Sequence, residues 1–397
     1  MRVLDFSKVL AGPLCTQHLG DMGADIIKVE PCRGGDDTRT WPPFQDGEGT
    51  IFLSVNRNKR SLAVDLKSQA GREICLRLAR GCDVVIESFA PRVAERLGIG
   101  YDDLRAANPA IVYCSVSGFG TRGPMRDDKG YDLIAQAFTG MLACTGAPGG
   151  PMARSPFSPV DQGTGLYAVI GIMGALMRRA ATGAGTKLEV SLFDTAVSFL
   201  SYMLQGYWQT GRDPVPPGSG HESLCPYQVF ETQDGPIILG VATDGMWRQF
   251  CALVGRSELG QDPRFATSAA RVANRAETVD LVAEFLRQKP RAAWLALLGE
   301  NIPCSPVHRL SEMARHEHTE QSGMLLRYRD ARGQAAQGVA LPLRADGLRA
   351  GGGSPPPRLG EHTRDVLAEC GYSAAECETF LRDNVVFAGL EAAGAGP

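Results

Sequence analysis

RVLDFSKVLAGPLCTQHLGDMGADIIKVE, residues 2–30, sets two short apolar runs on either side of a segment with helical spacing. The alternation continues to residue 120 through SLAVDL, AGREICLRLARG, DVVIESF and AIVYCSV. Short strands that alternate with helices are typical of βαβ units and a parallel sheet. Runs such as DVVIE are apolar throughout, which indicates strands buried on both faces. We therefore predict an α/β fold with a parallel sheet near the start of the chain.

The rest of the chain predicts one more strand of that sheet and then a second domain, since 397 residues exceed one ordinary hydrophobic core. Residues 187–208 indicate a strand followed by a long helix. The Pro-, Gly- and Ser-rich stretch 212–224 indicates a loop or linker. Residues 227–242 predict a β-hairpin that turns at Asp234-Gly235, because Asp-Gly tolerates positive φ. A mostly helical stretch, 246–300, and two short closing helices complete the pattern.

The charge balance excludes several classes of partner. With 41 basic and 44 acidic residues and a net charge of −3, the chain lacks the basic excess of a nucleic-acid-binding or membrane-anchored protein. The uncharged run 163–177 is shorter than the roughly 18 to 20 residues of a membrane span, and we interpret it as a buried helix. Met1 and Arg2 lead straight into a strand, which leaves no room for a signal sequence. We expect a cytoplasmic protein that contacts neither membrane nor nucleic acid.

Three motifs invite a chemical reading that the sequence does not support. Gly118-x-Gly120-x-x-Gly123 has dinucleotide-binding spacing, but no helical pattern follows it, so we assign these glycines to a loop. HEHTE, residues 316–320, lacks the histidine spacing of a zinc helix and indicates a solvated polar helix. The eleven cysteines form no C-x-x-C pair, which is typical of reduced, buried thiols. We expect no metal site.

Cations gather where the predicted strands end. NRNKRS, residues 56–61, precedes one strand, Lys67 follows it, and Arg92 and Arg96 follow the next. Ligands of open α/β sheets bind outside the carboxyl ends of the strands. Cations in that position favour a phosphorylated ligand, although charge runs are also common in plain solvated loops.

Asp161 stands alone in SPVDQGTGLYAVIGIMGALMRR, residues 158–179, directly before a long apolar run. An aspartate there can cap the helix by accepting N–H bonds. The same helix dipole and N–H groups would favour an ionised carboxylate, as a nucleophile requires. Small residues such as Gly163, Gly165, Gly171 and Gly174 would let backbone or a ligand approach closely. Both the cap and the nucleophile remain open from the residues alone.

Ordered blocks through nearly the whole chain resemble the family III CoA-transferases. They include residues 3–31, 56–67, 83–98, 130–140 and 160–176, followed by PYQVFETQDGPIILGVA and the tail RLGEHTRDVLAECGY. The resemblance implies a Rossmann-like large domain made from both chain ends, a smaller α+β domain and an interlocked homodimer. On this basis the expected segments are a large domain at 1–200, a linker at 201–224, a small domain at 225–325, a linker with a return strand at 326–357, and helices at 358–397 that complete the large domain.

The resemblance also implies a chemistry for Asp161, which matches the family's catalytic aspartate. The carboxylate would attack a donor acyl-CoA to give a mixed anhydride, and CoA would then return to form an aspartyl-CoA thioester. An acceptor acid would reverse these steps. Acyl-CoA is therefore a substrate, and no tightly bound cofactor, ATP or metal is expected.

Eleven further residues are expected to bind CoA. By position in the family pattern they are Val9, Ala11, Val64, Lys67, Phe89, Ala90, Val93, Arg96, Lys129 and Tyr131, with Arg39 added because Pro31 stands where formyl-CoA transferase has an arginine. Arg39 or the cations of residues 56–61 would then hold the phosphates. PGSGHE, with Gly218, Gly220 and His221, is the candidate for a lid over the substrate.

Two other functions compete with the transferase. An α-methylacyl-CoA racemase would need a histidine where this chain has Tyr131, and a phenol with an ordinary pKa near 10 is a poor base at neutral pH. A non-catalytic acyl-CoA-binding protein would use Asp161 only as a cap. For the transferase we expect a donor of the succinyl-CoA type and a dicarboxylate or aromatic-carboxylate acceptor, with His221 and Arg248 available to meet a distal carboxylate.

Overall fold

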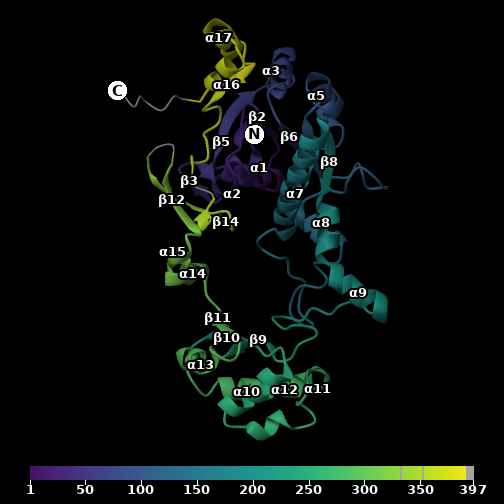
Figure 1. Ribbon diagram of the computed structural model, residues 1–397, viewed down its shortest axis with the longest axis vertical. Helices are drawn as coiled ribbons and strands as arrows, with labels where there is room; N and C mark the ends of the chain where they lie inside the picture. The colour runs from purple at the N-terminus through teal and green to yellow at the C-terminus, as the bar shows by residue number, and fades with distance from the viewer. Residues whose placement is uncertain (331–332, 351–352, 390–397) are drawn as a thin grey trace. The chain divides into compact units, whose positions relative to one another are not determined.

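The computed structural model describes residues 1–330, 333–350 and 353–389. The chain forms two compact units. The first unit comprises Met1–Met141, Ser155–Gly206 and His318–Pro397, and the second comprises Leu142–Arg154 and Tyr207–Glu317. The elements of both are labelled in Figure 1.

A seven-stranded sheet organises the first unit. Its strands, in spatial order, are β16 (Val386–Phe387), β5 (Lys59–Val64), β2 (Asp25–Glu30), β1 (Arg2–Phe6), β6 (Val84–Glu87), β7 (Val112–Ser117) and β8 (Thr186–Ser191). All neighbours pair in parallel except β16, which is antiparallel to β5. The predicted parallel sheet is thus confirmed. The strand order reverses between β1 and β6, where the chain first builds outward through β2 and β5 and then resumes on the other side.

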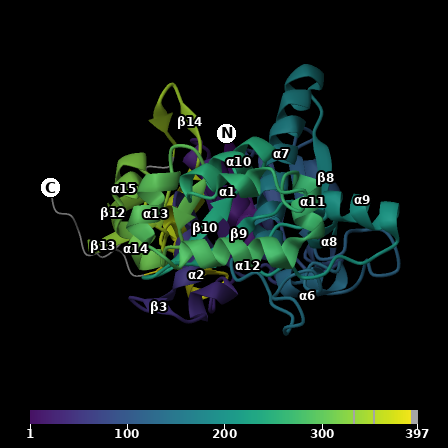
Figure 2. The ribbon, with the colours of Figure 1, turned by 90° about the horizontal axis from the view of Figure 1, so that it is seen from below.

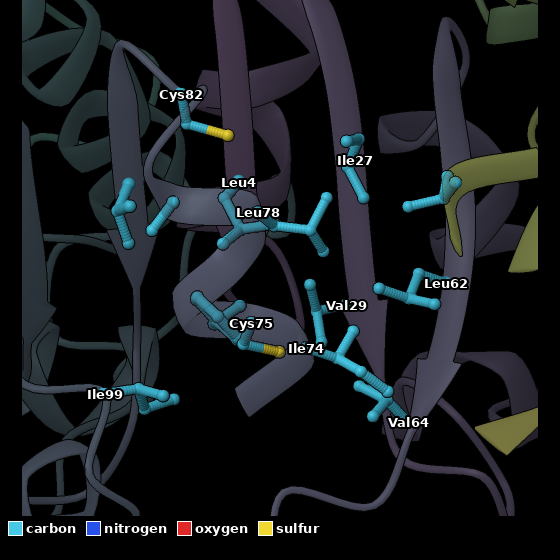
Figure 3. Close-up of a cluster of buried hydrophobic side chains, with 14 of the residues drawn as sticks. Leu4, Ile27, Val29, Leu62, Val64, Ile74, Cys75, Leu78, Cys82 and Ile99 are labelled. Carbon is cyan, nitrogen blue, oxygen red and sulfur yellow. The ribbon is translucent and has the colours of Figure 1, made fainter. Parts of the chain in front are cut away.

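Both faces of this sheet are covered, as the continuous apolar strands predict. On one face, Leu4, Ile27 and Leu62 pack against Ile74 and other side chains of α3 (Gln69–Ala79), with α5 (Tyr101–Ala107), α16 (Thr363–Glu369) and α17 (Ala374–Arg382) (Figure 3). On the other face, α1 (Ala11–Asp21) and α7 (Pro159–Thr182) pack on β1, β6 and β7. Successive strand residues point to opposite faces, so Val3 and Leu4 belong to different cores.

The remaining elements of the first unit are short. They are η1 (Asp37–Thr40), α2 (Thr50–Val55), α4 (Val93–Arg96), α6 (Asp132–Phe138), α8 (Leu192–Phe199), α9 (Ser201–Thr210), and the ribbons β3 (Phe44–Gln45) with β4 (Glu48–Gly49), β12 (Leu325–Arg329) with β13 (Ala335–Val339), and β14 (Arg344–Ala345) with β15 (Leu348–Arg349). Helix α15 (Glu317–Ser322) contains His318 and buries none of its residues, which confirms a solvated polar helix from residue 317. His316 lies before it, in extended backbone at the end of α14.

The second unit is an α+β arrangement around a three-stranded antiparallel sheet (Figure 2). Strands β9 (Tyr227–Glu231) and β10 (Pro236–Gly240) form the predicted hairpin, and β11 (Cys304–Pro306) extends it. Its helical elements are α10 (Asp244–Leu253), η2 (Ser257–Gly260), α11 (Ser268–Ala273), α12 (Arg275–Leu286), α13 (Arg291–Leu298) and α14 (Leu310–Arg315). Its core gathers Trp247, Phe250 and Trp294 against the sheet residues Ile237 and Leu239.

Two predictions about helices were wrong. Residues 192–210 form two helices rather than one, because the chain interrupts the helix at Leu200 between α8 and α9. Helix α7 is not buried all round: Leu166, Ile170, Met173 and Met177 are exposed. Its buried side is made mainly of small residues such as Gly163, Gly165 and Ala168, although Val160 and Ile172 are also buried. Among the described residues α7 alone has the length and composition of a candidate membrane span, a test that core helices also pass.

Candidate active site

Two neighbouring cavities lie at the carboxyl ends of the central strands. The first, of about 290 Å³, is lined by the segments after β1 and β6, by the end of β7, by the loop before α6 and by Asp161. The second, of about 880 Å³, is lined by the segments after β2, β5 and β6 and by β16. Lys8, Ser88, Phe89 and Ala90 line both cavities, so the two are adjacent. The reversal of strand order between β1 and β6 is the place where open α/β sheets bind ligands.

Asp161 reaches the first cavity from the first turn of α7. The structure separates the two roles that the sequence left open, because another residue caps the helix. Asp132, which begins α6, accepts hydrogen bonds at Oδ1 from the backbone N–H groups of Val160 (2.9 Å) and Asp161 (3.2 Å). Its Oδ2 accepts from the side-chain amide of Gln136. No hydrogen bond to the Asp161 carboxylate is found in the described part of the chain.

The electrostatics of Asp161 differ from the expectation that the helix terminus favours the ionised form. Burial, followed by the negative charge of Asp132, raises the pKa of Asp161 to about 7. The N–H groups that would have stabilised its charge are bound to Asp132 instead. Asp161 is therefore a partly buried carboxylate that ionises near neutral pH and carries an unshared charge into the cavity.

The glycines of α7 fix where Asp161 stands. A Cβ on Gly163 would lie 2.2 Å from the ring of Phe199 in α8, and a Cβ on Gly165 would lie 2.7 Å from the carbonyl oxygen of Ala11. The close approach predicted at these two glycines is therefore confirmed. The groups that approach them belong to α8 and to the start of α1. Gly171 and Gly174 meet no such contact, since the nearest atom to a Cβ on Gly171 lies at 3.6 Å.

The loop before α6 brings two further predicted residues to the first cavity. Gly118 and Gly130 lie back to back, because a Cβ on Gly118 would be 2.6 Å from the backbone of Gly130. Lys129 and Tyr131 flank that crossing and line the cavity, and the Tyr131 side chain is 58% exposed. Residues 118–131 contain no helix, which confirms the loop assignment of the three glycines.

Most of the residues expected to bind CoA line the two cavities. Val9, Ala11, Phe89, Ala90, Lys129 and Tyr131 line the first, and Val64, Lys67, Phe89 and Ala90 line the second. Val93 and Arg96 lie on α4 and line neither. Arg92, in a left-handed conformation just before α4, pairs with Asp127 at 3.0 Å.

The cations expected to hold the phosphates are paired with carboxylates of the same chain, so that expectation is corrected. Arg39 is 5% exposed, binds the Glu30 carboxylate through Nε and Nη2, and stacks on Phe52. Arg57 pairs with Asp21, and Lys59 is buried against Asp5. Arg60 binds Asp25 and Glu369 on the surface, away from either cavity. These cations hold the sheet and its neighbouring segments together.

Sequence reasoning missed one residue that lines the second cavity and one residue that binds the backbone at Asp161. Arg33 follows β2, is exposed and lines the second cavity together with Lys67. The rule that ligands lie beyond strand ends could have identified Arg33, since it follows β2 by three residues. Asp132 was quoted within a family block and given no role, because only its hydrogen bonds to α7 reveal one.

The candidate lid belongs to the second unit. Gly218 has a φ of 65° and its N–H donates to the carbonyl of Gly146 at 2.9 Å. The N–H of Gly220 donates to Pro217, and that of His221 donates to Tyr227 at 3.1 Å. The segment is thus tied to β9 and to a loop of the same unit, and movement over a substrate stays a prediction.

Comparisons with known proteins agree on one family. The model of CoA-transferase family III matches residues 1–363. A succinyl-CoA:glutarate CoA-transferase of Mus musculus is 36% identical over 97% of this chain and 89% of its own length. A succinate–glutarate CoA-transferase of Agrobacterium fabrum is 37% identical over 93% of this chain and 94% of its own. The crystal structure of a CAIB/BAIF family protein from Brucella suis superposes with a TM-score of 0.83, at 36% identity over 93% of this chain and 98% of that one.

Proposed function

The chain belongs to CoA-transferase family III, and we propose that Asp161 is the nucleophile with which it moves CoA from a succinyl-CoA-type donor to a dicarboxylate acceptor. The carboxylate in the cavity at the strand-order reversal is the observation that carries the proposal. Relatives named for succinyl-CoA with glutarate, mesaconate and D-citramalate support the substrate class. An aromatic acid is the less favoured acceptor, since no name among these relatives contains one.

The reaction exchanges one acyl bond for another without a metal or ATP. An oxygen of ionised Asp161 attacks the thioester carbon, the C–S bond breaks, and CoA leaves as a thiolate beside a mixed anhydride. The thiolate then attacks the aspartyl carbonyl of the anhydride and releases the donor acid, which leaves an aspartyl-CoA thioester. The acceptor carboxylate attacks that thioester, and the returning thiolate attacks the acceptor's acyl carbon. Asp161 is regenerated as a carboxylate.

The residues around Asp161 suit these steps. The raised pKa keeps the carboxylate basic, which favours attack, while still leaving much of it ionised at neutral pH. Lys8 and Lys129 line the same cavity and supply positive charge for the oxyanion and thiolate. The 21 residues that line this cavity include no histidine. A racemase, which needs a second base, is therefore less favoured.

We place the CoA along the two adjacent cavities. The thioester would lie beside Asp161 in the first cavity, and the adenosine phosphates would lie in the larger second cavity near Arg33 and Lys67. The four shared residues, Lys8, Ser88, Phe89 and Ala90, would line the path of the CoA between them. Val93, Arg96 and Arg39 have no direct part in this arrangement.

The proposal extends to assembly. We propose an interlocked homodimer of two-domain chains, in which the limits of the two compact units replace the limits of 1–200 and 225–325 expected from the sequence. The apolar side chains exposed on α7, Leu166, Ile170, Met173 and Met177, form a stripe that supports a covered surface there. The cytoplasmic location expected from the sequence stays a prediction.

Intact-protein mass spectrometry tests the nucleophile. The protein would be incubated with succinyl-CoA, quenched with hydroxylamine or borohydride, and digested to map the modified residue. We expect a hydroxamate or reduced product at Asp161, absent from Asp161→Asn, and transfer of CoA to glutarate by the wild type alone. An adduct that persists in Asp161→Asn, or α-proton exchange in deuterated water without any adduct, would refute this assignment.

A further inference from the structure

We infer that Asp36 is a positioning residue for the transfer reaction: it holds the turn at Val9, a wall of the cavity that contains Asp161, in a backbone conformation that valine avoids. This inference rests on the proposed function. Asp36 lies behind the turn and lines neither cavity. It therefore acts through the backbone of residues 7–9 and not by touching substrate.

The turn joins the end of β1 to the start of α1 and is strained. Val9 has a φ of 70°, in the left-handed region, where a β-branched side chain is disfavoured by contact with its own backbone. Such conformations persist only where the surrounding structure determines them, and they concentrate at functional sites. Val9 lines the first cavity together with Leu10, Ala11 and Gly12.

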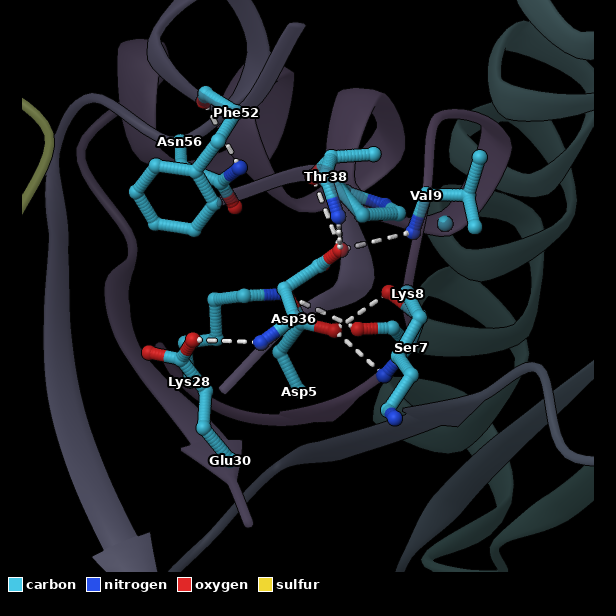
Figure 4. Close-up of polar contacts among 12 residues, drawn as sticks. Asp5, Ser7, Lys8, Val9, Lys28, Glu30, Asp36, Thr38, Phe52 and Asn56 are labelled. Carbon is cyan, nitrogen blue, oxygen red and sulfur yellow. Dashed lines mark hydrogen bonds and ion pairs between the residues drawn. The ribbon is translucent and has the colours of Figure 1, made fainter. Parts of the chain in front are cut away.

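A buried polar network holds Val9 in this conformation (Figure 4). The N–H of Val9 donates to Oδ1 of Asp36 at 3.3 Å. The ammonium of Lys28 donates to the carbonyl of Ser7 and to Oδ2 of Asp36, both at 2.9 Å. The N–H of Ser7 donates to Oδ1 of Asp5 at 2.9 Å. Backbone groups on both sides of Lys8 are thus fixed by charged groups, and such bonds are stronger than those between neutral partners.

The side chains of this network are surrounded by other protein atoms, so they cannot shift together with the turn. Asp36 and Lys28 are fully buried. Asp36 also accepts from the N–H (3.0 Å) and hydroxyl (2.7 Å) of Thr38, and its own N–H donates to Glu30. Although burial raises the pKa of Asp36, Lys28 and the Thr38 N–H bring it down to about 2, so the acceptor stays ionised.

On its other side the same segment touches the helix of Asp161. The carbonyl of Ala11 lies 2.7 Å from where a Cβ of Gly165 would stand, and a Cβ on Gly12 would lie 2.3 Å from Ser7. The segment 7–12 is therefore fixed between the buried network and α7. Release of Val9 would move the cavity wall relative to Asp161, and small displacements of this kind slow a reaction that depends on orientation.

A double-mutant cycle tests the inference on the full-length protein. Asp36→Asn weakens the acceptor for Val9, and Val9→Gly removes the strain, because glycine adopts positive φ freely. We expect Asp36→Asn to lower kcat/KM for succinyl-CoA with glutarate by about 10- to 100-fold. Addition of Val9→Gly should restore much of that loss, so that the two changes are strongly non-additive. A purely stabilising role of Asp36 predicts a lower Tm with kcat/KM of the folded protein unchanged.

Asp21→Asn is the matched control, because Asp21 is likewise buried and paired with a cation, Arg57, yet lines neither cavity. It should lower the Tm and leave kcat/KM unchanged. If Asp36→Asn does not fold, Lys28→Gln combined with Asp36→Asn removes the unpaired buried cation and enters the same cycle. An additive cycle, or a folded Asp36 variant within twofold of wild-type kcat/KM, refutes the inference.

The proposed function and this inference can fail separately. Wild-type protein that transfers no CoA refutes the proposed function. The cycle is then read from the Kd of CoA by calorimetry, where rescue of Asp36→Asn by Val9→Gly still supports the positioning role and additivity refutes it.

Discussion

At the scale of single residues, the properties of Asp161 depend on a neighbour that binds its backbone. Asp132 takes the two N–H groups at the start of α7 and leaves Asp161 without them, while its own charge contributes to the raised pKa of Asp161. One carboxylate thus stabilises the helix terminus, and the other is left basic and unbonded. Environment separates the roles of two identical groups.

This arrangement predicts a pH profile. Asp161 must be ionised to attack, so kcat/KM should rise with pH and level off above the pKa of about 7. Asp132→Asn keeps an oxygen that can accept the two N–H bonds but removes the negative charge. The midpoint of the rise should therefore move to lower pH, as measured from kcat/KM for succinyl-CoA between pH 5 and pH 9. An unmoved midpoint would show that the charge of Asp132 does not govern Asp161.

Arg33 and Arg39 predict different effects, the first on binding of acyl-CoA and the second on stability. Arg33 is exposed in the second cavity, so Arg33→Ala should raise KM for acyl-CoA about tenfold and leave kcat unchanged. Arg39 is buried in pairs with Glu30 and Glu48, so Arg39→Ala should cost roughly 3–5 kcal/mol of unfolding free energy, by analogy with other broken buried pairs. Steady-state kinetics and urea unfolding of both variants separate the roles. An unchanged KM in Arg33→Ala would remove Arg33 from the binding site.

The same residues mark how far the sequence could predict the site. Asp161, Lys129 and Tyr131 were identified as site candidates, and the structure brings them to one cavity. The sequence could not distinguish Arg39 from Arg33, because the difference is the Glu30 carboxylate beside Arg39, which only the folded chain supplies. Asp36 and Asp132 act through backbone groups distant in sequence, and no local pattern encodes such contacts.

At the scale of elements, α7 shows why a pattern of apolar residues predicted a helix correctly and its burial incorrectly. Hydropathy gives the apolar content, but the buried side of α7 is made mainly of small residues that approach α1 and α8 closely. The large residues Leu166, Ile170 and Met177 are left exposed. The break between α8 and α9 was missed for a related reason, since neither glycine nor proline marks Leu200.

The glycine contacts of α7 predict a graded effect of added methyl groups. Gly165→Ala places a Cβ against the backbone of Ala11, which cannot rotate away, so α7 must shift and unfolding free energy should fall by about 1–3 kcal/mol. The shift should also lower kcat by moving Asp161. Gly171→Ala meets only the flexible Leu188 at 3.6 Å and should leave both quantities unchanged or raise stability slightly. Equal effects at the two positions would contradict this account.

At the scale of the whole molecule, topology places the site before any side chain is considered. The strand order β5-β2-β1-β6-β7 reverses at β1 and β6, where the first cavity lies beyond the carboxyl ends, and the second cavity lies beside it beyond β2 and β5. The βαβ rhythm of the sequence predicted the parallel sheet, but the order of its strands became known only from the pairing. In the single chain, the apolar stripe of α7, the helix that carries Asp161, is exposed to solvent.

Because the stripe and Asp161 lie on the same helix, α7, we expect dimerisation to affect the rate of transfer. Ile170 is 65% exposed within the stripe, so Ile170→Glu should weaken the proposed dimer, give monomer on dilution and make the Tm depend on protein concentration. Leu310→Glu is the control: Leu310 is 82% exposed on α14 in the other unit, and the same charge there should leave the mass unchanged. Light scattering and a dilution series of kcat measure both. If Ile170→Glu keeps the wild-type mass at every concentration, the stripe is not the covered surface; if it dissociates and loses kcat, assembly maintains the position of Asp161.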